Sequence, residues 1–179
     1  MALRPWKKVS QKRALDNPWW TYRCDEIRLP NGASGEYHYV HSPGSSMVIP
    51  RQDDGTFVMV NQYRYLASRE SIEFPCGSVK RNSEHEATAR VELEEETGYA
   101  ASKLTFLGEF NPYNGVTDEM CRIYLAEQLR FVGSRPDDTE EFELLIRSAA
   151  QIDESIRDGS LWDGMSIVAW GIARARGIV

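Results

Sequence analysis

The stretch from residue 84 to residue 97 constrains this chain more than any other segment. It contains neither Gly nor Pro, and Gly98 follows it, so we predict a helix that ends at that glycine. Ser83 precedes the stretch and Glu86 lies three residues further on, a pattern typical of a capping box at a helix N-terminus. We therefore expect a helix with fixed ends at this point of the chain.

Three carboxylates gather on one side of this predicted helix. At 3.6 residues per turn, Glu92, Glu95 and Glu96 share an arc of roughly 100°, whereas Glu94 points elsewhere. Like charges at these spacings destabilise a helix by a few tenths of a kcal/mol each, and no basic residue in the next turn relieves them. A hard divalent cation would relieve this repulsion. Mg²⁺ in particular is usually bound by one or two carboxylates together with substrate phosphates. The pattern indicates metal-assisted phosphate chemistry.

The net charge of the chain limits the kinds of molecule that it is expected to bind. The 179 residues include 21 Lys and Arg and 27 Asp and Glu, a net charge of −6. Residues 84–96 and 137–143 each net −5, so the rest of the chain nets +4. An acidic chain binds polyphosphate backbones poorly, which disfavours nucleic acid as a partner, although basic residues 4–13 could form a local patch. Charge runs of this kind are more often solvated surface than sites.

Length and cysteine usage suggest one intracellular domain with a small extension. No apolar run approaches the roughly 20 residues of a membrane span, and residues 1–18 lack the apolar core of a secretory signal. Cys24, Cys76 and Cys121 are odd in number and widely spaced, so we expect a reducing cytoplasm and neither a disulfide framework nor a zinc site. The histidines have no metal-ligand spacing and are interpreted as structural or exposed: His38, His41 and His85.

Strand and turn signals predict a mixed α+β fold with few helices. Residues 1–17 are expected to form an irregular arm. A hairpin is predicted between residues 19 and 40, with Pro30-Asn31-Gly32 at its turn and positive φ angles at Asn31 and Gly32. A second hairpin is predicted around Asp53-Asp54-Gly55. Further strands are expected at 71–77, 104–110, 119–129 and 141–146, and closing helices at 151–159 and 164–175.

The spacing of the acidic helix resembles the Nudix box, G-x5-E-x7-R-E-U-x-E-E-x-G-U, where U is a bulky apolar residue. Two positions depart from it: Ser83 stands at the first Glu, and Val91 stands at the Arg, with Arg90 one place earlier. That Arg is thought to hold the catalytic carboxylates in the family, and Val91 cannot do so. We expect the protein to be an active enzyme. The alternatives are an enzyme of weak or altered activity and a degenerate version that only binds its ligand. The matching positions are Gly77, Glu92, Leu93, Glu95, Glu96, Gly98 and Tyr99.

Similarity outside the box points to the ADP-ribose pyrophosphatase branch over about residues 19–172. The stretches NGASGEYHYV, NQYRY, EFPCG, NGVTDE and DGSLWDGMSIVAW carry it. One marker differs, since branch members tend to have a Pro about 15 residues after the box, where this chain has Asn114 and places Pro112 two residues earlier. Another nucleotide sugar, such as GDP-mannose, or a dinucleotide therefore remains open as the substrate.

The resemblance implies a role for each site residue. The metal ligands would be Glu92, Glu95, Glu96 and the backbone carbonyl of Cys76, with Glu95 also activating water. Glu140 would be the general base, with Glu141 as the alternative, and a solvated acidic turn is the competing interpretation.

Substrate contacts are implied for a second group of residues. Arg64 would bind phosphate, with a structural ion pair to Glu73 as the alternative, and Glu73 would orient that arginine. Trp20 and Tyr22 would contact the nucleoside or sugar, although core or dimer packing is the commoner role for such aromatics.

The resemblance also implies the overall reaction and architecture. It predicts a Nudix α/β/α sandwich at residues 43–179 and an N-terminal β-rich extension at residues 1–42 that forms a homodimer. It further predicts Mg²⁺-dependent hydrolysis, with Mn²⁺ as an alternative metal, of ADP-ribose to AMP and ribose 5-phosphate.

Overall fold

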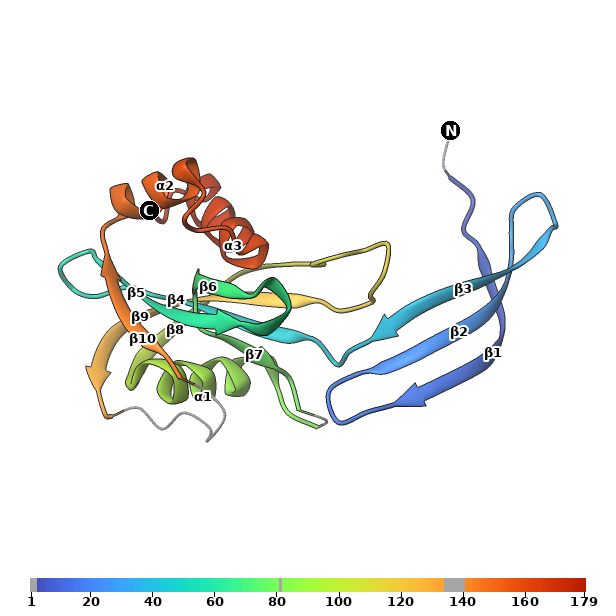
Figure 1. Ribbon diagram of the computed structural model, residues 1–179, viewed down its shortest axis with the longest axis horizontal. Coiled ribbons are helices and arrows are strands. Elements are labelled where there is room, and N and C mark those ends of the chain that lie inside the picture. Colours follow the sequence, from blue (N-terminus) through green and yellow to red (C-terminus); the bar gives the residue numbers. More distant parts are fainter. Residues whose placement is uncertain (1–2, 81, 134–140) are drawn as a thin grey trace. The chain divides into compact units, whose positions relative to one another are not determined.

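The computed structural model describes residues 3–80, 82–133 and 141–179. The chain divides into two compact units (Figure 1). The N-terminal unit comprises Met1–Gly44 and Asn111–Met120, and the main unit comprises Ser45–Phe110 and Cys121–Val179. Among the described residues, no helix is long and apolar enough to cross a membrane.

The N-terminal unit is an antiparallel sheet in the order β1-β2-β3, made of β1 (Lys7–Asp16), β2 (Thr21–Arg28) and β3 (Ser34–His41). The prediction of an irregular arm at residues 1–17 was wrong, because β1 pairs with β2 along its length. All ten residues of β1 are exposed, so neither face of the strand shows the apolar alternation that sequence patterns detect.

The predicted hairpin between residues 19 and 40 is present as β2 and β3, but its turn differs in detail. Gly32 takes a left-handed φ of 89°, whereas Asn31 does not adopt a positive φ. Instead, the Asn31 side chain accepts a hydrogen bond from the backbone N–H of Ala33, and the Gly32 N–H donates to the carbonyl of Leu29. Only the glycine therefore supplies the conformation that closes the turn.

The main unit holds a mixed sheet in the order β7-β4-β9-β8 and an antiparallel sheet in the order β10-β5-β6. The parallel pairing of β4 with β9 makes the first sheet mixed. The strands of that sheet are β4 (Ser45–Pro50), β7 (Cys76–Ser78), β8 (Tyr99–Phe110) and β9 (Cys121–Phe131). Those of the second are β5 (Phe57–Arg64), β6 (Arg69–Glu73) and β10 (Glu143–Arg147), with a short 3-10 helix, η1 (Tyr65–Ala67), between β5 and β6.

The second predicted hairpin was wrong, because β4 and β5 belong to different sheets. An isolated bridge between Arg51 and Phe57 and a hydrogen bond from the Gln52 N–H to the carbonyl of Thr56 join the two segments around the turn at Gly55. The turn signal was real, but it marks the crossing from one sheet to the other. The single strand predicted at 71–77 is likewise divided into β6 and β7 at Phe74 and Pro75.

Helices cover both sides of the main unit, as the predicted α/β/α sandwich requires. In Figure 1, α1 (His85–Thr97) lies on one side of the strands, and α2 (Ala149–Asp158) and α3 (Gly164–Ala175) lie on the other. The helix bounds expected from the sequence are close to those observed. The fold class predicted from the sequence is confirmed.

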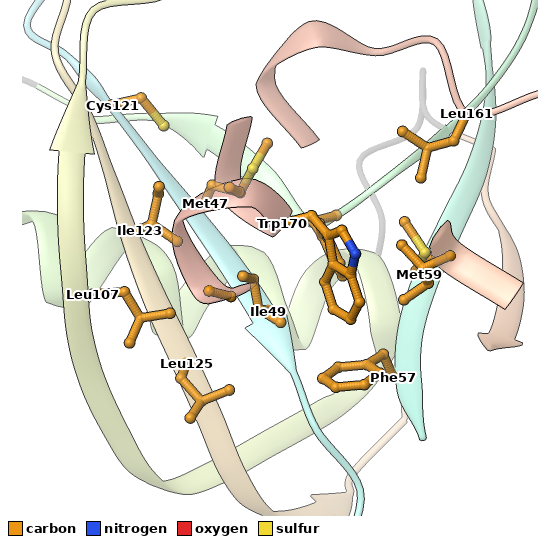
Figure 2. Close-up of a cluster of buried hydrophobic side chains, with 14 residues drawn as sticks. Met47, Ile49, Phe57, Met59, Leu107, Cys121, Ile123, Leu125, Leu161 and Trp170 are labelled. Atoms are coloured by element: carbon orange, nitrogen blue, oxygen red, sulfur yellow. The ribbon is translucent and has the colours of Figure 1, made fainter. Parts of the chain in front are cut away.

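Strand β4 explains why the core has two sides. Met47 and Ile49 face the cluster that includes Trp170 of α3, whereas Val48 faces the cluster that includes Ala89 and Leu93 of α1. Figure 2 shows the first cluster, with Trp170 beside Phe57; their rings meet edge to face with centroids 5.0 Å apart. A strand buried on both faces loses the alternating pattern and is apolar throughout.

The start of α1 differs from the predicted capping box. The helix begins one residue later, with Glu84 at the N-cap and no side-chain hydrogen bond there. The Ser83 N–H instead donates to the carbonyl of Lys80 in the preceding turn. The end matches the prediction, since Gly98 has a φ of 73° and its N–H donates to the carbonyl of Glu94.

Candidate active site

The first element of the site is the contact between β7 and α1. Gly77 of β7 pairs with Ser46 of β4 and faces the side chain of Glu92 on α1. A Cβ atom at Gly77 would overlap the carboxylate of Glu92. The lack of a side chain at Gly77 therefore creates the space that holds this carboxylate against the backbone next to Cys76.

The other two carboxylates of the predicted arc, those of Glu95 and Glu96, differ in surroundings. Glu96 is buried at 6% exposure, one residue before the end of the helix. Glu95 is partly buried and, together with Val91 and Glu94, lines a cavity of about 250 Å³. The three carboxylates of the predicted 100° arc therefore have different surroundings: Glu96 is buried, Glu92 packs against β7 and Glu95 lines a cavity.

Arg64 and Glu73 form an ion pair in the sheet β10-β5-β6. The Arg64 Nε donates to Glu73 Oε1 at 2.7 Å, and its Nη2 donates to Glu73 Oε2. Gln62 also donates to Glu73 Oε2, at 3.3 Å, so the buried carboxylate accepts from two side chains. The Glu73 carboxylate raises the pKa of Arg64, with smaller contributions from Asp163 and Glu96.

Arg64 of one sheet and Cys76 of the other are affected by the same two carboxylates. Glu96 of α1 and Asp163, the N-cap of α3, act on both Arg64 and the Cys76 thiol. Asp163 was not predicted from the sequence as a member of this group. Its Oδ2 accepts the N–H of Ser166, an N-cap signature that the sequence alone could have indicated.

The thiol of Cys76 is a poor metal ligand in this environment. A hydrogen bond with Cys121, followed by burial, raises the pKa of the Cys76 thiol well above its usual value. A protonated thiol does not bind a hard cation, whereas a backbone carbonyl can. The predicted use of the carbonyl rather than the sulfur is chemically consistent with these surroundings.

Arg90, one residue before the arginine position of the box, bonds to Ala101 and Glu86. Arg90 donates from Nη1 to the carbonyl of Ala101 at 3.0 Å and from Nη2 to Glu86 at 2.8 Å. It therefore ties α1 to β8 and does not replace the arginine that the Nudix pattern places at Val91. Val91 is exposed beside Glu95.

The other predicted site residues lie elsewhere. Trp20 and Tyr22 belong to the N-terminal unit, where Trp20 is half exposed and the Tyr22 hydroxyl lies 2.7 Å from His38 Nδ1. Glu140 lies outside the described residues. Glu141, the alternative base, is exposed two residues before β10.

Comparison with known proteins agrees with this arrangement. Residues 41–158, about two thirds of the chain, match the model of the NUDIX domain. The chain belongs to the Nudix family. Residues 6–40 match a second model, described as the nucleoside diphosphate sugar hydrolase N-terminal domain. The predicted family is confirmed, and the protein is a Nudix pyrophosphohydrolase; Nudix enzymes generally use divalent metal ions.

Relatives place this Nudix protein in the ADP-ribose pyrophosphatase branch. The ADP-ribose pyrophosphatase of Bacillus subtilis is 36% identical over 154 residues, which cover 83% of each chain. The GDP-mannose pyrophosphatase of Citrobacter koseri is 27% identical over 73% of this chain and 72% of that protein. A crystal structure titled ADP compounds hydrolase superimposes with a TM-score of 0.83 over 98% of this chain and 95% of that one, at 17% identity, and shares its fold.

Proposed function

We propose that this Nudix protein hydrolyses ADP-ribose to AMP and ribose 5-phosphate in a reaction that depends on Mg²⁺. The observation that carries the proposal is the Glu92 carboxylate, held in the space that Gly77 leaves beside the backbone of Cys76. The 36% identity to an ADP-ribose pyrophosphatase supports the choice of substrate. The free thiols of all three cysteines support a cytoplasmic location.

The residues present suit a hard divalent cation. Glu92, Glu95, Glu96 and the carbonyl of Cys76 offer only oxygen, the donor that Mg²⁺ prefers, and Mn²⁺ accepts the same set. The space left by Gly77 admits one of these carboxylates, that of Glu92, beside the backbone next to Cys76. When bound there, Mg²⁺ would neutralise the diphosphate and lower the pKa of water.

The chain's own residues would orient the substrate and move the proton. Arg64 would bind a phosphate oxygen with the part of its guanidinium that Glu73 leaves free, and Glu73 would fix its orientation. Glu95, or a glutamate at position 140 or 141, would accept the proton of the water that attacks phosphorus. Trp20 and Tyr22 would contact the nucleoside or sugar.

A second substrate class is favoured by one observation, the relationship to a GDP-mannose pyrophosphatase. Asn114, in place of the branch's usual Pro, also supports this alternative. A dinucleotide would be a third possibility with the same bond chemistry. All of them contain a diphosphate between two organic groups, so the same carboxylates and Arg64 would serve.

The decisive experiment compares Glu96→Gln with the wild-type protein. Product analysis would use ADP-ribose, GDP-mannose and a dinucleotide diphosphate in Mg²⁺. We expect the variant to lose more than about a hundredfold in kcat/KM, since the metal's charge stabilisation is worth several kcal/mol. Glu94→Gln is the matched control, because Glu94 is an exposed glutamate on the same helix.

The outcomes of this comparison separate the alternatives. AMP and ribose 5-phosphate formed by wild type and by Glu94→Gln, but not by Glu96→Gln, would support the proposal. Full turnover by Glu96→Gln would contradict the carboxylate assignment. Tight ADP-ribose binding without product in Mg²⁺ or Mn²⁺ would instead identify a non-catalytic ligand-binding module, the function that Val91 and Ser83 favour.

The N-terminal unit is proposed to join two chains into a homodimer. Its support is the apolar surface that this unit exposes at the turn between β1 and β2, formed by Leu15, Trp19 and Trp20. Exposed apolar groups of this size often mark an interface.

A further inference from the structure

Three potential metal ligands meet on one face of the N-terminal sheet. The register of β2 and β3 places Cys24 directly opposite His38, and Glu36 precedes His38 by two residues on β3. Side chains two residues apart on a strand lie on the same face, so these ligands converge although their positions in the sequence do not resemble a metal-binding motif. They are separate in sequence and in chemistry from the box carboxylates of the main unit.

The ligand atoms already lie near the spacing of a metal site. The Cys24 Sγ is 4.0 Å from His38 Nε2, and this Nε2 is 3.6 Å from Glu36 Oε2. One sulfur, one ring nitrogen and one carboxylate oxygen all lie within 4.8 Å of one another. Tetrahedral zinc, with bonds near 2.3 Å to sulfur and 2.1 Å to nitrogen, sets those two atoms about 3.6 Å apart. The sulfur and the ring nitrogen therefore need to approach each other by only tenths of an ångström.

A neighbouring tyrosine holds the histidine in the required orientation. The Tyr22 hydroxyl lies 2.7 Å from the other ring nitrogen, Nδ1, and the two rings stack with centroids 6.1 Å apart. With the proton on Nδ1 donated to Tyr22, the lone pair of Nε2 faces Cys24 and Glu36. Metal-bound histidines commonly donate their second ring N–H to an oxygen in this way.

A lysine leaves one carboxylate oxygen available. Lys12 of β1 donates to Glu36 Oε1 at 2.9 Å, while Oε2 is the oxygen that faces His38. Cys24 is buried, whereas His38 and Glu36 are exposed.

We propose that Cys24, Glu36 and His38 bind a Zn²⁺ ion, with the Cys24 thiolate, His38 Nε2 and Glu36 Oε2 as ligands and water in the fourth position. Binding releases the thiol proton to solvent. Sulfur and imidazole favour Zn²⁺ over Mg²⁺, so a millimolar excess of Mg²⁺ leaves this site to zinc. The ion would clamp β2 to β3 and stabilise the N-terminal unit as zinc concentration rises.

Cobalt substitution tests the site without relying on catalysis. Full-length protein, stripped with a chelator and returned to excess Mg²⁺, is titrated with Co²⁺ and then with Zn²⁺. We expect one Co²⁺ per chain, a thiolate-to-cobalt charge-transfer band in the near ultraviolet, and loss of that band when Zn²⁺ displaces the cobalt. Absence of the band, or cobalt displaced by Mg²⁺, would overturn the proposal.

Variants assign the ligands. Cys24→Ser should abolish the band. His38→Gln should abolish stoichiometric binding, and because His38 is exposed we expect the circular dichroism spectrum of this variant to match that of the wild type. Tyr22→Phe should weaken zinc binding about tenfold, the usual effect of losing a partner of a metal-bound histidine. His41→Gln is the matched histidine control, since His41 lies on the same strand but pairs with Asp118 at 2.8 Å.

A second control addresses the carboxylate. Glu26→Gln changes the glutamate paired opposite Glu36, and it should leave the Co²⁺ spectrum unchanged, whereas Glu36→Gln should shift it and weaken binding. Equal effects of the two glutamate variants, or of the two histidine variants, would mean that the cluster is an ion-paired sheet surface and that zinc binds elsewhere.

Discussion

At the scale of single residues, the pairing of Arg64 with Glu73 shows how an exposed cation can be held by a buried anion. Glu73 is buried, and its two oxygens engage both sides of the Arg64 fork. A bidentate contact fixes a guanidinium more firmly than a single bond does. The arginine therefore presents its remaining donors in one orientation, which is what recognition of a phosphate requires.

Replacing Glu73 with glutamine is expected to impair substrate binding more than turnover. The neutral amide cannot accept both guanidinium bonds, so Arg64 becomes mobile and KM for ADP-ribose should rise about tenfold, with kcat changed less. The free energy of unfolding should fall by about 1–2 kcal/mol, because one buried polar contact is lost. Steady-state kinetics and urea denaturation measure both quantities.

Glu70→Gln is the control for this experiment. Glu70 is an exposed glutamate on the same strand and accepts one hydrogen bond from Asn61. It should change neither KM nor stability appreciably. If Glu73→Gln behaved like Glu70→Gln, the ion pair would be incidental to substrate binding.

Residue identities at the box could be predicted from sequence because the match is a fixed spacing along one helix. The surroundings could not, because they depend on which strands lie beside that helix. The departure at Val91 was visible in the sequence, whereas the contact of Arg90 with Ala101 required the position of β8. Cys24 and His38 are a similar case, since only the strand register brings them together.

At the scale of elements, helices were easier to predict than strand pairing. The stretch without Gly or Pro and the glycine at its end are local signals, and α1 follows them closely. The sequence of a strand does not show which strand it pairs with. The turn at Gly55 therefore suggested a hairpin, although β4 and β5 belong to different sheets. Strand β1 gave no signal at all, because its exposed faces need no apolar pattern.

The contact between β7 and α1 makes a prediction about Gly77. In Gly77→Ala the new methyl group would displace the Glu92 carboxylate, which is the far end of a flexible side chain and can move at little cost in stability. We expect the melting temperature to change little while the Mg²⁺ concentration needed for half-maximal activity rises about tenfold or more. Activity measured against Mg²⁺ concentration, together with calorimetry, tests this.

Gly171→Ala provides the matched glycine control. Gly171 lies in α3, and a Cβ atom there would meet nothing within 4 Å. Its substitution should leave the Mg²⁺ dependence unchanged and slightly favour the helix. An unchanged Mg²⁺ dependence in Gly77→Ala as well would show that the position of Glu92 does not matter for metal use.

At the scale of the whole molecule, the net charge of −6 is the sum of segments that have different roles. The acidic helix places carboxylates where the proposed Mg²⁺ would neutralise them, so acidity does not oppose an anionic substrate. In the N-terminal unit, every residue of β1 is exposed, whereas Cys24 and Ile27 of β2 are buried. A sheet with one fully exposed strand is expected to gain stability from a partner.

This expectation leads to a prediction about the assembly. Sedimentation equilibrium of the full chain at micromolar concentration should give about twice the 20.4 kDa mass of one chain. Leu15 and Trp19 are 67% and 75% exposed at the turn between β1 and β2, and replacing both with lysine should yield monomers, because paired charges would oppose burial. Leu66→Lys is the control, at a main-unit leucine that is 96% exposed. A wild-type monomer, or a double variant that remains dimeric, would assign the apolar turn another role.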